Sequence, residues 1–131
     1  MHQYKTTLSS IEELEKLYTA LNWNQIGLTR DELNQMVAGS WYSIFVYKEA
    51  NLIGTGRIIS DGVITGLICG VGVLPLYQGQ GVGKKIIEKL VNECEKNRIF
   101  PQLMCDKSLI SFYESIGFKE FTVGMNYSIK R

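Results

Sequence analysis

The 131-residue sequence has little of what marks several classes of protein. It has three cysteines, which cannot all pair within one chain, and a single histidine. Its 14 Lys and Arg nearly balance 13 Asp and Glu, which leaves a net charge of +1. This balance excludes the broad electropositive field expected of a protein whose main partner is nucleic acid or an anionic membrane. Cys69, Cys94 and Cys105 have apolar neighbours, and we expect buried free thiols in a reducing cytosol, with no metal site.

No charged residue lies between Asp61 and Lys84, and this stretch resembles a membrane span at first sight. Its apolar part, residues 63–76, is interrupted by three glycines and a proline. It is also shorter than the roughly 20 apolar residues of a spanning helix. The first residues of the sequence lack the apolar core of a secretory signal. We therefore predict a soluble, cytoplasmic protein in which this stretch forms a buried strand followed by a loop.

The length and a hydrophobic content of 45% predict one domain over residues 1–131. Apolar residues at helical spacing predict two early helices, one opened by Ser9 and Ser10 and one by Thr29 with Glu32. Further strands are expected at 4–7, 41–47, 52–60, 63–74 and 100–105, an amphipathic helix from Val82, a helix closed by Gly117, and one or two final strands within 118–129. The order β-α-α-β-β-β-α-β-α-β-β predicts an α/β fold with a mixed central sheet flanked by helices.

The most informative segment is the glycine-rich turn after the apolar strand. Each glycine in a helical turn costs about 1 kcal/mol relative to alanine, so three alternating glycines indicate that something approaches the backbone closely. Free N–H groups at a helix N-terminus, with Lys84 and Lys85 in its first turn, suit a phosphate. The spacing fails the Walker A pattern, where Gln78 replaces the first glycine, and the dinucleotide pattern, where Lys84 replaces the third. We predict a phosphate-bearing ligand of another kind.

The run Gln78-x-x-Gly81-x-Gly83, after a strand that ends at Pro75, resembles the acetyl-coenzyme A signature of the GNAT superfamily of N-acetyltransferases. Residues 112–118, Phe-Tyr-Glu-Ser-Ile-Gly-Phe, resemble the second recurring motif of that superfamily. The two motifs follow in the expected order, separated by one helix and one strand. The resemblance implies an N-acetyltransferase that moves an acetyl group from acetyl-coenzyme A to a primary amine of a small molecule.

The resemblance also implies roles for individual residues. The pantetheine arm of the cosubstrate would pair with backbone groups of Val71 and Val73. Its pyrophosphate would rest on backbone N–H groups at Gln78, Gly79, Gly81, Val82, Gly83 and Lys84. Tyr113 matches the general acid that protonates the leaving thiolate, although an aromatic at helical spacing also fits a core position. Gly70 and Gly72 fit a bulge or a close approach of the cosubstrate, or only tight packing.

The sequence departs from the family pattern at the general base. Many members carry Glu or Asp in the strand before Pro75, where this chain has Cys69 and Gly70. Cys69 has no evident histidine partner, so a structural thiol is favoured over a nucleophile. The base is absent, supplied by water, or delivered from elsewhere in the chain. The alternative function is a non-catalytic acyl-coenzyme A-binding module.

Acceptor specificity in this superfamily usually resides in the first two helices and their loop, here residues 20–30. Trp23 and Ile26 are available to line a pocket there. Such a pocket would hold an ammonium group by cation–π contact, or an apolar group, while Trp23 equally fits the core. No acidic cluster marks this loop, so a polyamine acceptor is not indicated. The acceptor itself stays open, as does the oligomeric state, for which a homodimer is one option.

Overall fold

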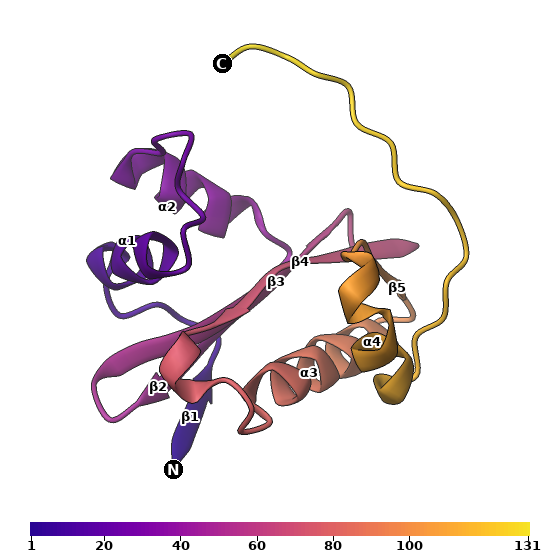
Figure 1. Cartoon of the computed structure of the whole chain (residues 1–131), viewed down its shortest axis with the longest axis horizontal. Helices are drawn as coiled ribbons and strands as arrows, with labels where there is room; N and C mark the ends of the chain where they lie inside the picture. Colours follow the sequence, from indigo (N-terminus) through magenta and orange to yellow (C-terminus); the bar gives the residue numbers. More distant parts are fainter.

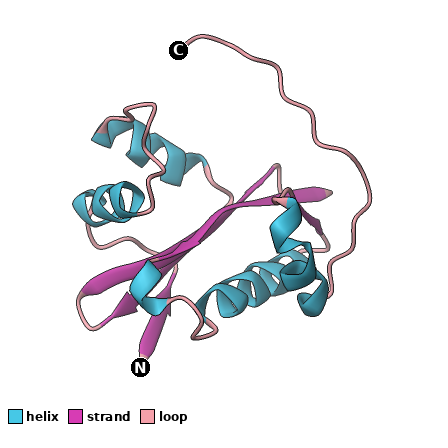
Figure 2. Ribbon diagram, viewed as in Figure 1, coloured by secondary structure: helices cyan, strands magenta, loops and turns pink.

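In the computed structural model, which describes residues 1–131, all strands join one five-stranded sheet in the order β1-β2-β3-β4-β5 (Figures 1 and 2). The strands are β1 (His2–Lys5), β2 (Tyr42–Lys48), β3 (Asn51–Ser60), β4 (Thr65–Val73) and β5 (Phe100–Leu103). The first four pair antiparallel, and β5 is parallel to β4. The expected mixed sheet of an α/β fold is therefore confirmed.

Helices cover both faces of this sheet. They are α1 (Ile11–Ala20), α2 (Arg30–Gly39), α3 (Val82–Lys96) and α4 (Ile110–Ile116), with short 3-10 turns at Pro75–Tyr77 and Lys107–Leu109. Figure 1 shows α1 and α2 on one side of the sheet and α3 and α4 on the other. None of these helices is both long and apolar enough to cross a membrane.

The start of α2 follows the sequence signal closely. Thr29 accepts a hydrogen bond from the Glu32 backbone N–H, and the Glu32 carboxylate accepts one from the Thr29 N–H, which completes the predicted capping box. At the start of α1 the same expectation is wrong. Ser10 occupies the N-cap position there, but its side chain makes no capping hydrogen bond.

The sheet is buried on both faces because each face has its own core. On the α3 side, Ile53 and Ile58 pack against Ile86, Ile87 and Leu90, all fully inaccessible to solvent. On the α1 and α2 side the buried cluster comprises Leu14, Leu17, Tyr18, Leu33, Phe45, Tyr47 and Leu52. Burial on both faces explains why β2 and β3 have nearly continuous apolar runs.

The sheet opens between its last two strands. Pairing of β4 with β5 runs from Thr65 opposite Phe100 to Ile68 opposite Leu103 and then ends. Because β4 continues to Val73, its second half has a neighbouring strand on one side only. The fold therefore leaves a stretch of unpaired backbone directly before the glycine-rich turn.

The final strands expected within residues 118–129 are not present. After Gly117 the chain has no regular structure and extends away from α4 as an open arc, yellow in Figure 1. Apolar side chains do alternate along it, and Phe121, Val123 and Met125 are 63%, 81% and 92% exposed. A strand must pair to satisfy its N–H and C=O groups, and this segment pairs with no strand, although the outer edge of β5 is free. Its last residue, Arg131, instead forms an ion pair with Glu32 of α2 at 3.2 Å.

Candidate active site

Along the unpaired edge of β4, every second residue turns its backbone N–H and C=O groups away from β3. Leu74 N–H donates to the Ile53 carbonyl of β3 at 2.8 Å, so the backbone groups of Leu74 face β3. Successive residues of a strand turn their N–H and C=O groups to opposite edges. The backbone groups of Val73 and Val71 therefore face the side that β5 has left. These are the two residues that the family resemblance assigns to the pantetheine arm.

A β-bulge shapes the middle of β4. Thr55 pairs with Gly72 and Arg57 pairs with Cys69, so two residues of β4, Gly70 and Val71, stand opposite one residue of β3. Gly70 has a φ of +61°, a left-handed conformation that favours glycine. The structure therefore shows a bulge at this position, one of the roles expected for Gly70.

Gly72 is explained by packing instead. A Cβ atom at Gly72 would lie 2.3 Å from a ring carbon of Trp23, which is closer than atoms can approach. The Trp23 indole therefore lies directly on the backbone of β4, and only glycine gives it room. Its ring also meets the Tyr18 ring edge to face, with centroids 5.3 Å apart.

The glycine-rich turn is open to solvent. Gly79 and Gly81 have φ values of +78° and +82°, and a Cβ atom at either position would meet nothing within 4 Å. Gly81 is the N-cap of α3, so no side chain caps the first turn of this helix, which contains no acidic residue. Unsatisfied N–H groups and the positive end of the helix dipole therefore face this open turn.

The other turn residues have distinct environments. Val82 begins α3 and is 2% exposed, so only its backbone is available to a ligand. Gly83 follows in the first turn of α3, and Lys84 is exposed beside it. The Gln78 side chain donates a hydrogen bond from Nε2 to the Val73 carbonyl at 2.9 Å. That bond occupies one of the backbone groups assigned to the cosubstrate.

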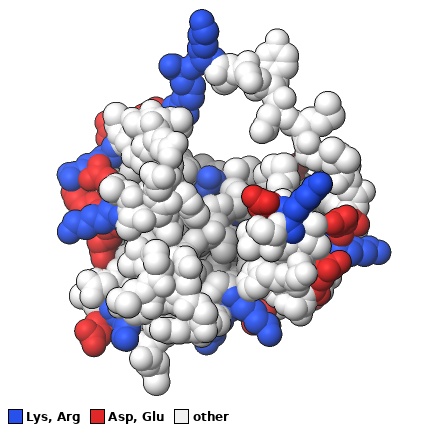
Figure 3. Space-filling model, viewed as in Figure 1, with Lys and Arg blue, Asp and Glu red and all other residues white.

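A pocket of about 450 Å³ lies at the bulge, on the face of the sheet that carries α1 and α2. Its lining comprises Tyr18, Trp23, Leu28, Met36, Arg57 and Met104 around Cys69–Val71 of β4. Ile26, expected beside Trp23, does not contribute and is 62% exposed. Figure 3 shows charged side chains mainly along the flanks of this view, while its hollowed middle is largely uncharged.

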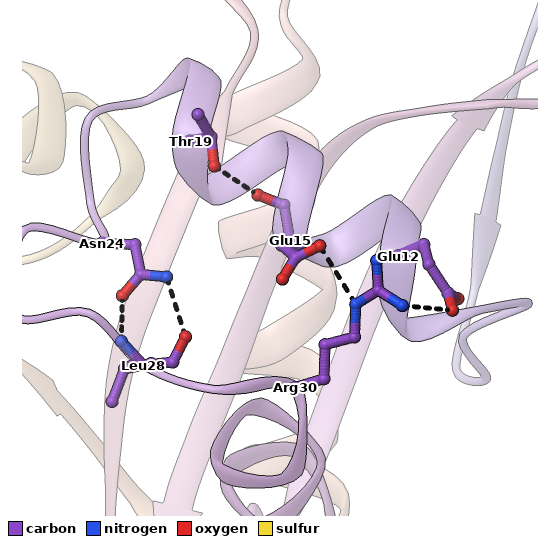
Figure 4. A network of polar contacts seen from close by, with 6 residues as sticks. All are labelled: Glu12, Glu15, Thr19, Asn24, Leu28 and Arg30. Carbon is purple, nitrogen blue, oxygen red and sulfur yellow. Dashed lines mark hydrogen bonds and ion pairs between the residues drawn. The ribbon is translucent and has the colours of Figure 1, made fainter.

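The loop that carries Trp23 is held by polar contacts (Figure 4). The Asn24 side chain bonds both backbone groups of Leu28, accepting from its N–H at 2.6 Å and donating to its carbonyl at 3.1 Å. Arg30, at the start of α2, binds Glu12 and Glu15 of α1 at 3.1 and 3.2 Å. These contacts close the loop and join the two helices, which positions Trp23 over β4.

Sequence reasoning missed Arg57 and placed Tyr18 only in the apolar face of a helix. A signal for Arg57 was available, since it is the only charged residue of β3. A lone charge in a strand buried on both faces needs a partner or a role. Tyr18 gave no such signal, because a tyrosine at helical spacing is indistinguishable from a core aromatic.

Burial raises the pKa of two groups that line the pocket, Tyr18 and Cys69, and of Tyr113 on α4, which does not line it. It raises the pKa of Tyr18, whose hydroxyl lies beside the opposing charge of Arg57. It raises the pKa of Cys69, which keeps this thiol protonated and supports its interpretation as structural. It raises the pKa of Tyr113 as well, and Cys105 adds to the effect. All three side chains are therefore neutral at physiological pH.

Tyr113 lies on α4, half-buried between two aromatic neighbours. Its ring meets Phe112 and Phe118 edge to face, with centroids 5.0 and 5.9 Å away. Its ring packs against the core on the α3 side of the sheet, but its hydroxyl makes no hydrogen bond with the chain. The side chain therefore combines a core position with a free, protonated hydroxyl.

The three cysteines are free, as expected, but they are not all buried. Cys94 belongs to α3 and is buried in the core, and Cys69 is half-buried at the pocket. Cys105 is exposed, because β5 ends at Leu103 and the chain then leaves the sheet. The expectation of three buried thiols is wrong for Cys105.

Comparison with known proteins identifies the family. A model of the acetyltransferase (GNAT) domain matches residues 40–120, which include the diverging strands, the glycine-rich turn and α4. The chain belongs to the GNAT acetyltransferase family. The uncharacterized N-acetyltransferase ycf52 of Pyropia yezoensis is 29% identical over 83% of this chain and 64% of its own. This chain spans between 28% and 64% of the length of the first curated relatives that it matches.

Solved structures share the whole fold. A Staphylococcus aureus protein, SA2161, described as a "probable acetyltransferase", superposes with a TM-score of 0.84 at 23% identity, over 98% of this chain and 100% of its own. A predicted acetyltransferase from Clostridium acetobutylicum, solved with acetyl-CoA, superposes with a TM-score of 0.70 at 19% identity, over 98% of this chain and 96% of its own. Both matches establish the GNAT fold for this chain.

We predict that Gly72→Ala expels the Trp23 indole from β4, because the added Cβ would overlap the ring. Overpacking of this kind costs about 1–3 kcal/mol of unfolding free energy. In a Trp41→Phe background, the Trp23 fluorescence should shift to the red. Gly39→Ala is the matched control, since a Cβ there meets nothing within 4 Å. Unchanged Trp23 emission in Gly72→Ala would contradict this packing.

We predict unequal alkylation of the three thiols by iodoacetamide in the native protein. Cys105 should react first because it is exposed, and Cys94 only on unfolding. Cys69 should react slowly at neutral pH and faster at a pH above the usual pKa of a thiol, because its raised pKa moves thiolate formation to higher pH. Peptide mass spectrometry over time measures the three rates. Equal rates for Cys69 and Cys105 at pH 7 would contradict the burial of Cys69.

Proposed function

We propose that residues 1–131 act as one N-acetyltransferase domain that transfers the acetyl group of acetyl-coenzyme A to a primary amine of a small molecule. The observation that carries this proposal is the divergence of β4 from β5 directly before an uncapped, glycine-rich helix start. The chain's family consists of acetyltransferases, and one structural neighbour was solved with acetyl-CoA. Together these support acetyl-coenzyme A as the cosubstrate.

The residues of this edge fit such a ligand. A phosphate group has room at Gly79 and Gly81, where a Cβ would meet nothing. Backbone N–H groups from Gln78 through Lys84 would hold the pyrophosphate. Val71 and Val73 would pair with the pantetheine arm. Because the Val73 carbonyl already accepts from Gln78, Val73 would offer its N–H.

We propose Tyr113 as the general acid. The amine nitrogen attacks the thioester carbonyl, the carbon–sulfur bond breaks, and the leaving sulfur takes the Tyr113 phenol proton. The raised pKa of Tyr113 keeps that proton in place through neutral pH. No carboxylate lines the pocket, and burial keeps Cys69 and Tyr18 protonated. The amine therefore loses its own proton to water.

A non-catalytic acyl-coenzyme A-binding module is the second candidate. The absence of a carboxylate from the pocket lining favours it. Release of free thiol from acetyl-coenzyme A, measured with a panel of small amines, separates the two functions. The enzyme releases thiol in proportion to acetylated amine, whereas the module binds acetyl-coenzyme A and releases none.

We also propose that the protein resides in a reducing compartment such as the cytosol, and that it forms a homodimer. The three free cysteines support the compartment. The exposed segment after Gly117 supports the homodimer. Its alternating apolar side chains, which continue to Tyr127 and Ile129 at 92% and 77% exposure, have no partner in the single chain.

We predict that Gly81→Val weakens binding of coenzyme A at least about tenfold, because a β-branched residue at a φ of +82° distorts the turn and its N–H groups. Calorimetry with coenzyme A measures the affinity. Gly27→Val is the matched control, since Gly27 also has a positive φ, +74°, with open space around it. Equal affinity for coenzyme A in Gly81→Val and the wild type would contradict the binding of the pyrophosphate at this turn.

We predict that Tyr113→Phe lowers kcat by about 10²–10⁴-fold, the usual contribution of a general acid, with little change in affinity for acetyl-coenzyme A. Phenylalanine keeps both aromatic contacts. With no base in the pocket, the rate of both proteins should rise with pH toward the pKa of the amine.

Tyr127→Phe, at an exposed position, is the control for the loss of one hydroxyl. Thiol release over pH 6–9 provides the measurement. A kcat of Tyr113→Phe equal to that of the wild type would return Tyr113 to a purely structural role.

A further inference from the structure

Arg57 places an unpaired cation in the pocket at the bulge. It projects from the middle of β3 and is the only lining residue that is charged at neutral pH, because Tyr18 and Cys69 stay protonated. None of the lining residues is a carboxylate. The pocket therefore has a net positive charge inside an otherwise apolar wall.

The chain provides no anion for this cation. All four salt bridges of the structure involve other residues, and the one polar side chain that Arg57 contacts by a hydrogen bond is the neutral Tyr18 hydroxyl. Its Nε atom is buried and has no hydrogen-bond partner at all. Native proteins rarely leave a buried donor unsatisfied, because such a donor has lost its hydrogen bonds to water and gained none in return.

The unsatisfied Nε lies against the backbone of β4 at the bulge. A Cβ atom at Gly70 would lie 3.2 Å from Arg57 Nε and 3.5 Å from the Tyr18 hydroxyl oxygen. Because Gly70 has no side chain, Arg57 and Tyr18 come close to its backbone at the wall of the pocket, where the Tyr18 O–H donates only a long hydrogen bond, to Met36 Sδ at 3.8 Å. A planar guanidinium binds a carboxylate through paired hydrogen bonds, and a phenol O–H adds a further one.

The remaining wall of the pocket has a different chemistry. Trp23, Leu28, Met36 and Met104 contribute apolar surface. The space is therefore suited to a small molecule with a carboxylate at one end and an apolar side chain. Gly70 and Val71 border it, and Val71 belongs to the backbone edge proposed for the pantetheine arm, so the amine of such a molecule lies near the proposed acetyl donor.

From this geometry we infer that the acceptor is an α-amino acid with an apolar side chain, whose carboxylate binds Arg57 and the Tyr18 hydroxyl. The inference rests on the proposed acetyl transfer and adds the class of acceptor. Arg57 is then the residue that selects the acceptor. The Tyr18 hydroxyl beside Arg57 is neutral, so the chain leaves the positive charge of Arg57 without a counter-charge.

The experiment compares amino acids with their uncharged amides. L-Phenylalanine, L-leucine and L-methionine are each tested against L-phenylalaninamide, L-leucinamide and L-methioninamide, with thiol release from acetyl-coenzyme A giving kcat/KM. The amides keep the amine and the side chain and lose only the negative charge. Their amines are also less basic, so more neutral amine is present, which biases the comparison against the proposal. We expect the acids to be preferred by about 10- to 100-fold, the effect of hydrogen bonds to a charged group.

Substitutions then test the role of Arg57 directly. Arg57→Gln should abolish the preference for acids, Arg57→Lys should keep part of it, and Arg57→Glu should reverse it toward the amides. Arg98→Gln, which removes an exposed arginine, is the matched control and should keep the full preference. Should these variants fail to fold, the comparison of acids with amides in the wild type decides by itself.

Two results would overturn the inference while acetyl transfer stands. One is equal kcat/KM for acids and amides in the wild type. The other is a loss in Arg57→Gln that is the same for both, as expected of a residue that acts on the acetyl donor or only on the fold.

A binding measurement covers the case in which no amine causes thiol release and the proposed function fails. Calorimetry of L-phenylalanine with the wild type and Arg57→Gln, in the presence of coenzyme A, needs no turnover. Binding to the wild type alone supports the carboxylate site, and binding to neither protein overturns it.

Discussion

The separation of β4 from β5 is the constraint on which the rest of the site depends. Pairing stops at Ile68 and Leu103, and the bulge at Gly70 bends β4 just beyond that point. The free edge of β4 runs from this bulge to Val73 and leads straight into the turn that opens α3. The pocket at the bulge, the unpaired edge of β4 and the open glycine turn therefore follow one another along β4 toward α3.

The charged features of the site are all positive. The uncapped start of α3 attracts negative charge at one end of that line, and Arg57 does so at the other. In the pocket, burial keeps the Cys69 thiol and the Tyr18 phenol neutral, and no carboxylate lines it. A site of this kind suits two anionic substrates and lacks a protein base. The sequence shows part of this absence of acidic side chains between Asp61 and Lys84, while Arg57 on β3 supplies the positive charge.

The sequence was most predictive where local signals and burial agree. The capping box of Thr29 and Glu32, the amphipathic face of α3 and the stop at Gly117 all appear where they were expected. The bulge and the turn were also readable, because a positive φ strongly favours glycine and Gly70, Gly79 and Gly81 all adopt one. Ser10 shows the limit of a local signal, since capping spacing alone does not ensure the hydrogen bond.

Long-range geometry accounts for the remainder. The alternation of residues 119–129 is typical of a strand, but alternation alone does not determine whether a segment pairs, and this one stays unpaired beside a sheet whose β5 edge is free. The sequence marks Arg57 as the lone charge of a strand, but only the fold shows that no carboxylate lines the pocket beside it. Gly72 likewise needed the position of Trp23, which comes from a distant loop held by Asn24.

The most direct test of the central claim is the effect of acetyl-coenzyme A on backbone amide resonances of the ¹⁵N-labelled protein. The free edge of β4 and the α3 turn should bind the ligand through their N–H groups. Resonances of Val71, Val73 and Gly79 through Lys84 should therefore shift most, while those of β1 and β2 stay in place. Large shifts confined to other parts of the chain, with these resonances unmoved, would contradict the account.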